Sequence, residues 1–324
     1  MSKPLVIVHA KLSDDLLDKL KQYFQLAVFE KLSSETMPLF KEHLKSAVGL
    51  VGTGLRVDES LLQHAPHLKV ASTISVGYDQ YDVAALTRHQ VVLTHTPNVL
   101  SDSVADLALA LMLAAARRVP ELDALVKQGK WNKQNDGNYF GVDVHHKTIG
   151  ILGMGRIGQV IAQRAHFGFG MKVIYTARQD KPEVDRTFQA QRQELNQLLS
   201  TADFVVNILP SNAQTQNLIG ENELALMKTS AVFINIGRGS TLDEQALYQA
   251  LQQRRILAAG LDVYQQEPLA TTSPLLGLDN VICLPHIGSA TAETRYAMQV
   301  CAVDNLINSL LYPNDQSKTV YRVI

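Results

Sequence analysis

A glycine-rich turn near the middle of the chain has the residue types and spacing that bind a dinucleotide. The motif GMGRIG directly follows the apolar run Thr148–Leu152 and precedes a helical pattern at Gln159–His166. Gly153 permits a tight turn, Gly155 lets the backbone approach a pyrophosphate, and Gly158 lets the helix pack close to the strand. The start of the helix offers free N–H groups and a positive dipole end to the phosphates. A glycine-rich turn without a ligand is the weaker interpretation. The predicted cofactor contacts here are Gly153, Gly155, Arg156, Ile157 and Gly158.

The end of the next apolar run indicates which dinucleotide is preferred. Sites for NAD usually carry an acid about 20 residues beyond the motif, where it binds the ribose 2′-hydroxyl. No acid lies at Tyr175–Arg178; Ala177 holds the natural position and Arg178 follows it. An arginine can bind a 2′-phosphate through paired N–H donors, so we predict NADPH, with NADH less favoured. The alternative is a solvated Arg178 with Asp180 binding the ribose.

Three later segments place polar side chains after apolar runs. They are Asn235–Gly239, Leu261–Pro268 and Leu284–Thr291. Open α/β sheets bind ligands at the carboxyl ends of their strands, so these segments are candidates for a ligand site. Taken singly, each key residue has an ordinary alternative. Arg238 fits a surface loop, Glu267 a turn before a proline, and His286 a satisfied loop histidine.

The order and spacing of the four motifs resemble one known family. GMGRIG, NIGRG, LDVYQQEP and PHIGSAT together resemble the D-isomer-specific 2-hydroxyacid dehydrogenases, and the resemblance extends to Ser75–Asp79 and over nearly the whole chain. It implies a reductase of small 2-keto acids, with glyoxylate, hydroxypyruvate and 2-ketogluconate as the candidate substrates.

The resemblance also implies a role for each catalytic position. Arg238 would bind the substrate carboxylate and polarise the carbonyl, because a guanidinium forms charge-assisted hydrogen bonds. His286 would donate the proton, since imidazole titrates near neutral pH. Glu267 would orient the imidazole and favour its protonated form.

Further positions carry over from the same resemblance. Val76 and Gly77 match a loop whose backbone binds the substrate carboxylate, and Ser289 lies beside the histidine. Asp262 matches the residue that contacts the nicotinamide carboxamide. The remaining predicted cofactor contacts are Leu209, Pro210, Thr215, Ile236 and Gly288. Trp131 begins a stretch that walls the pocket in related reductases, but no second tryptophan follows, so Tyr139 and Phe140 are possible replacements within 131–140.

Two other functions share this architecture. Formate dehydrogenases carry glutamine where Glu267 stands, which argues against that activity. Nucleotide-sensing corepressors keep the dinucleotide site but serve as interaction platforms, and this chain has no long disordered tail for partners. The histidine pairs at 64/67 and 145/146 lack an accompanying cysteine or acid cluster, so we predict no metal site.

The elements that must position these residues read as a doubly wound α/β protein. Apolar runs that do not alternate with polar residues are typical of parallel strands covered on both faces. The expected strands of a first set are Leu5–Val8, Val48–Val51, Val70–Ile74 and Val91–Thr94. Those of a second set are Thr148–Leu152, Lys172–Thr176, Phe204–Leu209, Val232–Ile236, Leu257–Val263 and Val281–Leu284. A helix is expected at Ser13–Tyr23, with Ser13 as its N-cap.

Two parallel-sheet domains follow from these sets. We expect residues 1–96 with 290–324 to form a flavodoxin-like substrate domain, and residues 97–289 to form an inserted Rossmann cofactor domain. The active site is expected in the cleft between them. The predicted helix Ser101–Arg118 is apolar almost all round, which fits an interdomain core helix or a subunit interface. We expect a homodimer through this helix, since two-fold dimers are the commonest oligomers.

Composition limits the partners. The 324 residues carry a formal net charge of −1 and no long Lys/Arg run, which gives no electrostatic basis for binding nucleic acid or an anionic membrane. Cys283 and Cys301 lie in apolar stretches and are expected to be buried free thiols. The apolar run Leu5–Ala10 is too short for a signal peptide or a membrane span, so a cytoplasmic protein is expected.

Overall fold

The computed structural model describes residues 3–132, 137–315, 317–318 and 320–324. The chain divides into two compact units, residues 1–100 with 290–324 (unit 1) and residues 101–289 (unit 2). Each unit is built on its own parallel sheet, of five strands in unit 1 and seven in unit 2. The fold is therefore the predicted pair of doubly wound α/β domains.

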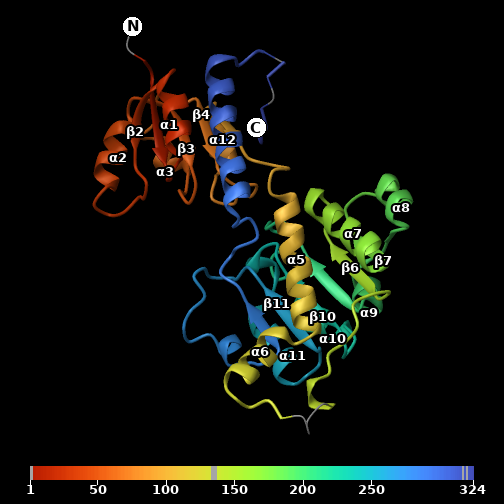
Figure 1. The fold of residues 1–324 in the computed structure, drawn as a ribbon. Coiled ribbons are helices and arrows are strands. Elements are labelled where there is room, and N and C mark those ends of the chain that lie inside the picture. Colours follow the sequence, from red (N-terminus) through yellow and green to blue (C-terminus); the bar gives the residue numbers. More distant parts are fainter. Residues whose placement is uncertain (1–2, 133–136, 316, 319) are drawn as a thin grey trace. The chain divides into compact units, whose positions relative to one another are not determined.

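Unit 1 contains a sheet in the order β2-β1-β3-β4-β5 (Figure 1). Its strands are β1 (Leu5–His9), β2 (Gln25–Val28), β3 (Ala47–Gly52), β4 (Val70–Thr73) and β5 (Val92–Thr94). Its helices are α1 (Asp14–Lys21), α2 (Met37–Leu44), α3 (Glu59–Leu62), α4 (Val83–Arg88) and α12 (Ala292–Leu311). One face of the sheet packs on a core that includes Phe40, Leu50 and Leu86.

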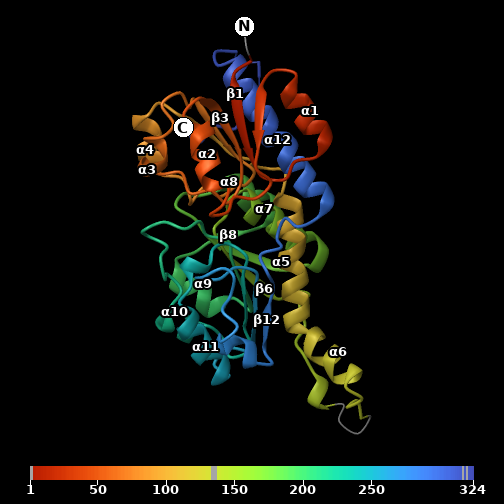
Figure 2. The same cartoon turned by 90° about the vertical axis from the view of Figure 1, so that its left-hand side faces the viewer.

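Helix α12 covers the other face of this sheet, although it follows unit 2 in the sequence (Figure 2). A Cβ at Gly49 of β3 would lie 3.0 Å from a methyl group of Leu306, so a glycine there allows the close approach of helix and strand. Ser72 Oγ also donates to the carbonyl oxygen of Ala302, at 2.8 Å. Unit 1 is thus completed by a helix made last.

Unit 2 contains a sheet in the order β12-β11-β10-β9-β6-β7-β8. Its strands are β6 (Thr148–Leu152), β7 (Lys172–Thr176), β8 (Gln191–Arg192), β9 (Phe204–Asn207), β10 (Val232–Asn235), β11 (Ala258–Leu261) and β12 (Val281–Cys283). Its helices are α5 (Ser101–Ala116), α6 (Val119–Lys127), α7 (Arg156–Phe169), α8 (Pro182–Phe188), α9 (Leu195–Thr201), α10 (Glu221–Leu226) and α11 (Glu244–Gln252), with short 3₁₀ turns η2 (Gly239–Thr241) and η3 (Pro274–Gly277). The strand order reverses direction between β6 and β9, which creates a crevice at their carboxyl ends.

The apolar helix α5 packs inside unit 2, against α7 and the strands β10 and β11 (Figure 1). Ala105, Leu111 and Met112 are among its buried residues. The expected extension of this helix to Arg118 is wrong, because α5 ends at Ala116 and Arg118 has a left-handed backbone with a φ of 55°. Packing on the sheet accounts for most of the apolar surface that the sequence displays.

Other sequence expectations need correction at element ends. The first helix spans Asp14–Lys21 rather than Ser13–Tyr23; Ser13 is at the N-cap position, but its side chain makes no capping hydrogen bond. Strands β2 and β8 were not expected. Both cysteines are free, as predicted, but half-buried rather than buried.

Candidate active site

The glycine turn after β6 has the geometry that a phosphate-binding turn requires. Gly153 has a backbone φ of 103°, which residues with a side chain rarely adopt. A Cβ on Gly158 would overlap the carbonyl oxygen of Gly153, so close packing of α7 requires a glycine there. At Gly155, by contrast, no described atom lies within 4 Å of where a Cβ would be. The protein's own packing therefore does not explain Gly155, whereas close approach of a ligand would.

Beyond this turn, the loop after β9 is tied together by its own side chains. Thr215 Oγ1 donates to the carbonyl oxygen of Pro210 at 2.6 Å and accepts from the backbone N–H of Asn212 at 2.9 Å. A Cβ at Gly237 would lie 2.8 Å from the carbonyl oxygen of Leu209, so this loop abuts the turn that follows β10. Thr215 thus holds the loop in shape, and its contact with a cofactor stays a prediction.

Two arginines lie near the end of β7, rather than the one expected from sequence. Arg178 is exposed after Ala177. Arg192, on the neighbouring strand β8, donates through Nε to the carbonyl oxygen of Ala177 and through Nη1 to the carboxylate of Asp180, both at 2.9 Å. Asp180, the alternative ribose ligand, is thus engaged by an arginine.

The predicted acid–base pair is in contact within unit 2. His286 Nδ1 lies 2.7 Å from Glu267 Oε2, and Glu267 Oε1 accepts from the backbone N–H of Tyr264 at 3.1 Å. Because a carboxylate only accepts, Nδ1 carries the proton in this contact, and Nε2 is the nitrogen that takes no part in it. The imidazole side chain is about half exposed, at 51%. These two side chains come from the loops after β11 and β12, which are adjacent parallel strands.

Asp262 holds the loop that carries the histidine. Its carboxylate is buried and accepts from the backbone N–H groups of Ile287 at 2.7 Å and Gly288 at 2.8 Å. Burial raises the pKa of Asp262, while these two backbone donors act in the opposite direction. Asp262 is therefore a positioning residue for His286, and its predicted contact with the nicotinamide stays a prediction.

A buried polar network supports the turn that carries Arg238. Asn207 donates to the side chains of Asn235 at 3.2 Å and Thr241 at 2.7 Å. Thr241 Oγ1 in turn donates to the carbonyl oxygen of Arg238 at 2.7 Å. The Arg238 guanidinium donates to the carbonyl oxygen of Gly237 at 2.8 Å. Asn207 and Thr241 were not predicted from sequence; a buried polar residue at a strand end was the available signal.

Gly239 joins the arginine turn to the glutamate loop. A Cβ on this residue would overlap the carbonyl group of Tyr264, three residues before Glu267. The contact brings the loops after β10 and β11 together. Unit 2 therefore gathers Arg238, Glu267 and His286 at the carboxyl ends of its strands. The predicted cofactor contact Ile236 is buried directly after β10.

The predicted substrate loop lies in unit 1, after β4. His95 Nδ1 lies 3.0 Å from the carbonyl oxygen of Val76, and Ser75 Oγ donates to the carbonyl oxygen of Gly77 at 2.5 Å. Within the described part of the chain, the backbone N–H groups of Val76 and Gly77 make no hydrogen bond. The loop therefore presents two donors, as a carboxylate-binding loop requires.

Some expected features lie outside this arrangement. Residues 133–136 of the predicted pocket wall are outside the described residues, while Trp131 and Phe140 are 61% and 75% exposed. Among the residues that the structure describes, no three His, Cys, Asp or Glu side chains group as metal ligands. No helix in the described ranges has the length and apolar character to cross a membrane.

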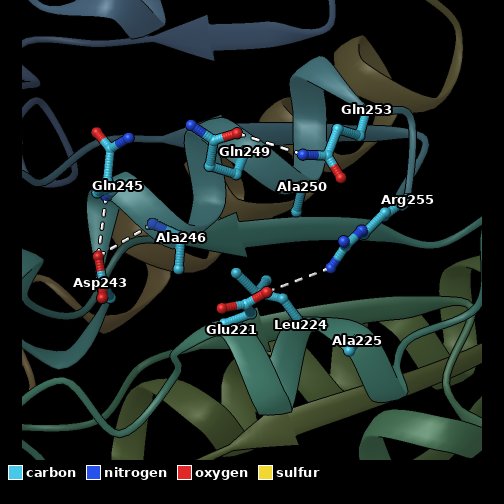
Figure 3. Close-up of a pocket in the computed structure, with 10 residues that line it drawn as sticks. All are labelled: Glu221, Leu224, Ala225, Asp243, Gln245, Ala246, Gln249, Ala250, Gln253 and Arg255. Atoms are coloured by element: carbon cyan, nitrogen blue, oxygen red, sulfur yellow. Dashed lines mark hydrogen bonds and ion pairs between the residues drawn. The ribbon is translucent and has the colours of Figure 1, made fainter.

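A cavity of about 280 Å³ between α10 and α11 contains none of the predicted site residues (Figure 3). Its polar lining has local partners: Arg255 lies 3.6 Å from the carboxylate of Glu221, and Asp243 caps the start of α11 by accepting from Gln245 and Ala246. Its charges are used within the fold, and we assign it no chemistry.

Comparison with known proteins identifies the class. Residues 109–288 match the family described as D-isomer specific 2-hydroxyacid dehydrogenase, NAD binding domain. The chain belongs to the D-isomer-specific 2-hydroxyacid dehydrogenase family and is an oxidoreductase.

Individual relatives show which members of this family the chain is similar to. The chain is 53% identical over 308 residues to glyoxylate/hydroxypyruvate reductase B of Klebsiella pneumoniae, covering 95% of each chain. It is also similar to the NADPH-dependent glyoxylate/hydroxypyruvate reductase of Sinorhizobium meliloti solved with NADP and malonate, at 30% identity and a TM-score of 0.83 over 99% of each chain. A glyoxylate reductase from Paecilomyes thermophila superposes with a TM-score of 0.89 at 29% identity, over 100% of this chain and 99% of that one.

Proposed function

We propose that this protein reduces small 2-keto acids to 2-hydroxy acids with NADPH, and that glyoxylate, hydroxypyruvate and 2-ketogluconate are among its substrates. The single observation that carries the proposal is the 2.7 Å contact between His286 and Glu267 at the sheet edge that also holds Arg238. The names of the Klebsiella and Sinorhizobium relatives support the first two substrates and the cofactor.

The residues divide the reaction into binding and proton transfer. Gly153, Gly155 and Gly158 would hold the dinucleotide, which would supply the hydride for the carbonyl carbon. Arg238 binds the substrate carboxylate and stabilises the negative charge that develops on the carbonyl oxygen. In unit 1, the backbone N–H groups of Val76 and Gly77 are donors suited to a substrate carboxylate. His286 transfers the Nε2 proton to the carbonyl oxygen and is left neutral, while Glu267 keeps the ring oriented through Nδ1.

The preference for NADPH rests on Arg178 and Arg192. Arg192 is held at the end of β7 by Ala177 and Asp180, which places a second positive charge near Arg178. A 2′-phosphate carries more negative charge than a hydroxyl, so two guanidinium groups favour the phosphorylated cofactor. Asp180, the first acid after β7, is engaged by Arg192 rather than left to bind the ribose.

Steady-state turnover tests the proposal directly. Glyoxylate, hydroxypyruvate and 2-ketogluconate are each compared by kcat/KM with NADPH and with NADH. Reduction of at least one with NADPH, and a higher KM for NADH, is the expected result. Absence of turnover with all three would contradict it and return attention to the nucleotide-sensing alternative, which no feature of the site favours.

We further propose a cytoplasmic homodimer with its interface on α6 rather than on the expected helix α5, because α5 is packed inside unit 2. Helix α6 has no buried residue, and Val119, Val126, Trp131 and Phe140 are all more than half exposed. Figure 2 shows α6 extending beyond the sheet of unit 2. Exposed apolar groups gathered on one projecting segment are typical of a protein interface. Light scattering should give twice the chain mass of 35.7 kDa; a monomer at micromolar concentration would contradict the dimer.

A further inference from the structure

Unit 1 has its own pocket at the carboxyl ends of its strands. The pocket encloses about 390 Å³ and is lined by residues that follow β1, β2, β3 and β4, together with Arg295 and Gln299 of α12. The strand order β2-β1-β3-β4-β5 reverses direction between β1 and β3. Open α/β sheets bind ligands in the crevice at such a reversal. The pocket is therefore in the place where this architecture binds small molecules.

The charges around the pocket are mostly positive. Lys11, Lys31 and Arg295 line it together with one acid, Glu30, so three cations and one anion leave a balance of +2. Within the described ranges, none of the three cations lies within salt-bridge distance of a carboxylate. An anionic group on a small molecule would complement this balance.

A buried histidine at the pocket lacks hydrogen-bond partners. His9, the last residue of β1, is 4% exposed, and neither of its ring nitrogens has a partner within the described chain. Its ring packs directly over Gly52, where any Cβ would overlap it. Burial lowers the pKa of His9 to about 4, although the backbone of Thr53 acts in the opposite direction. At neutral pH the ring thus offers one N–H donor and one acceptor. Both ring nitrogens are shielded from solvent, so the ring is a buried polar part of the pocket wall.

The pocket is continuous with the predicted substrate loop of the same unit. Ile74, which lines the pocket, directly precedes Ser75, Val76 and Gly77. The backbone N–H of Ile74 donates to the carbonyl oxygen of Gly52 at 2.8 Å, which ties this loop to the strand beneath His9. A molecule whose first carboxylate lies on Val76 and Gly77 can therefore extend its chain along unit 1 toward the cations.

We propose that this pocket binds the far end of the substrate, and that the enzyme favours 2-keto acids whose chain carries a second anionic group. The inference rests on the proposed function, because it takes the loop at Val76 and Gly77 as the site of the first carboxylate. Lys31 and Arg295 supply the charge that selects the second anion.

Three substrates of matched chemistry test the inference. 2-Oxoglutarate has a second carboxylate, 2-oxopentanoate has the same number of carbons without it, and glyoxylate is too short to reach the pocket. In the wild-type protein with saturating NADPH, kcat/KM for 2-oxoglutarate should exceed that for 2-oxopentanoate. The double variant Lys31→Gln/Arg295→Gln should lower kcat/KM for 2-oxoglutarate by roughly three- to tenfold, mainly through KM, as loss of two exposed ion pairs predicts. The same double variant should change kcat/KM for glyoxylate by less than about twofold.

Matched controls separate this inference from general effects. Lys41→Gln removes an exposed lysine on α2 outside the pocket and should change none of the three values. Raising the salt concentration should raise the KM for 2-oxoglutarate more than that for glyoxylate. Equal kcat/KM for 2-oxoglutarate and 2-oxopentanoate in the wild type, or equal losses on all three substrates in the double variant, would overturn the inference while leaving reduction of glyoxylate intact. Failure to reduce glyoxylate would instead overturn the proposed function.

Discussion

The two units are built on the same kind of parallel sheet, but they treat polar groups at its carboxyl edge in opposite ways. In unit 2, the buried side chains Asn207, Asn235 and Asp262 are joined by hydrogen bonds to their neighbours. In unit 1, the buried ring of His9 has no partner among the described residues, and three cations around it are unpaired with acids. A closed network of hydrogen bonds holds polar groups in one geometry, whereas cations without acidic partners can bind an anion. The difference fits the proposed division of roles, in which unit 2 supplies the reacting groups and unit 1 selects the substrate.

The largest effect should come from His286, the proposed proton donor of unit 2. If His286 protonates the carbonyl oxygen, His286→Ala should lower kcat for reduction by about 10²–10⁴, the usual range for general acid catalysis. The KM for NADPH should change little, because the glycine turn is untouched. Stopped-flow and steady-state rates with glyoxylate measure both. A variant that keeps more than a tenth of kcat would show that another group donates the proton.

The tight contact between the loops after β10 and β11 of unit 2 is tested at Gly239. Gly239→Ala places a Cβ against the carbonyl group of Tyr264 and should destabilise the protein by about 3 kcal/mol, as overpacking of a tight contact does. It should also lower kcat, because the Arg238 and Glu267 loops must separate. Gly277→Ala is the matched control, since no described atom lies within 4 Å of its Cβ. Urea unfolding of both variants gives the comparison; equal stabilities would mean that the loops are not held together at Gly239.

The open site of unit 1 is tested by pH. The pKa of His9 is lowered from 6.5 to about 4, so the unfolded chain binds a proton before the folded chain does. Stability is unaffected above pH 6.5 and is lost as pH falls from there toward 4. Between pH 7.5 and 5.0, the wild type should lose about 2 kcal/mol more than His9→Gln, which cannot titrate. Parallel pH slopes of unfolding free energy would show that His9 is not held neutral.

The role of Glu267 is tested by removing its charge. Glu267→Gln keeps a side-chain oxygen that can accept from Nδ1 of His286 but removes the negative charge, so kcat for reduction should fall by about tenfold while the KM for NADPH changes little. Glu267→Ala also removes the contact that orients the ring and should lower kcat further. Equal kcat in Glu267→Gln and the wild type would limit Glu267 to orienting the ring.

The smallest effect is expected at the cofactor end of unit 2. Arg192→Gln should raise the KM for NADPH by about threefold to tenfold, as loss of one exposed ionic contact predicts. The KM for NADH should stay the same, because NADH lacks the 2′-phosphate. Arg186→Gln, an exposed arginine on the nearby helix α8, serves as the charge control. Equal losses with both cofactors would remove Arg192 from the binding of the phosphate.

The sequence predicted those parts of the molecule that depend on local pattern. Strands such as β6, β9 and β10 are continuous apolar runs buried on both faces, and they were expected from that alone. The strands that were missed, β2 and β8, lie at sheet edges, where half-exposed residues give no such run.

The support of the site could not be predicted, because it depends on register between strands. Asn207 and Asn235 meet because β9 and β10 pair them side by side. Arg192 reaches the end of β7 because β8 pairs it with Tyr175. Neither pairing follows from the spacing of the residues along the chain. The motifs that carry Arg238, Glu267 and His286 were recognisable because each lies in a short segment of characteristic sequence.

The position of α12 has a consequence for how the protein folds during its synthesis. As the ribosome makes the chain, the first 100 residues emerge with the face of β3 and β4 that will meet Leu306 still uncovered. About 190 further residues must be translated before this helix appears, which takes roughly 10–40 s at about 5–20 residues per second. During that interval unit 2 can fold as a complete domain, while the older part of the chain waits with an apolar sheet exposed to chaperones and to neighbouring nascent chains. Synthesis of unit 1 thus begins first, but unit 1 is the last of the two units to be completed.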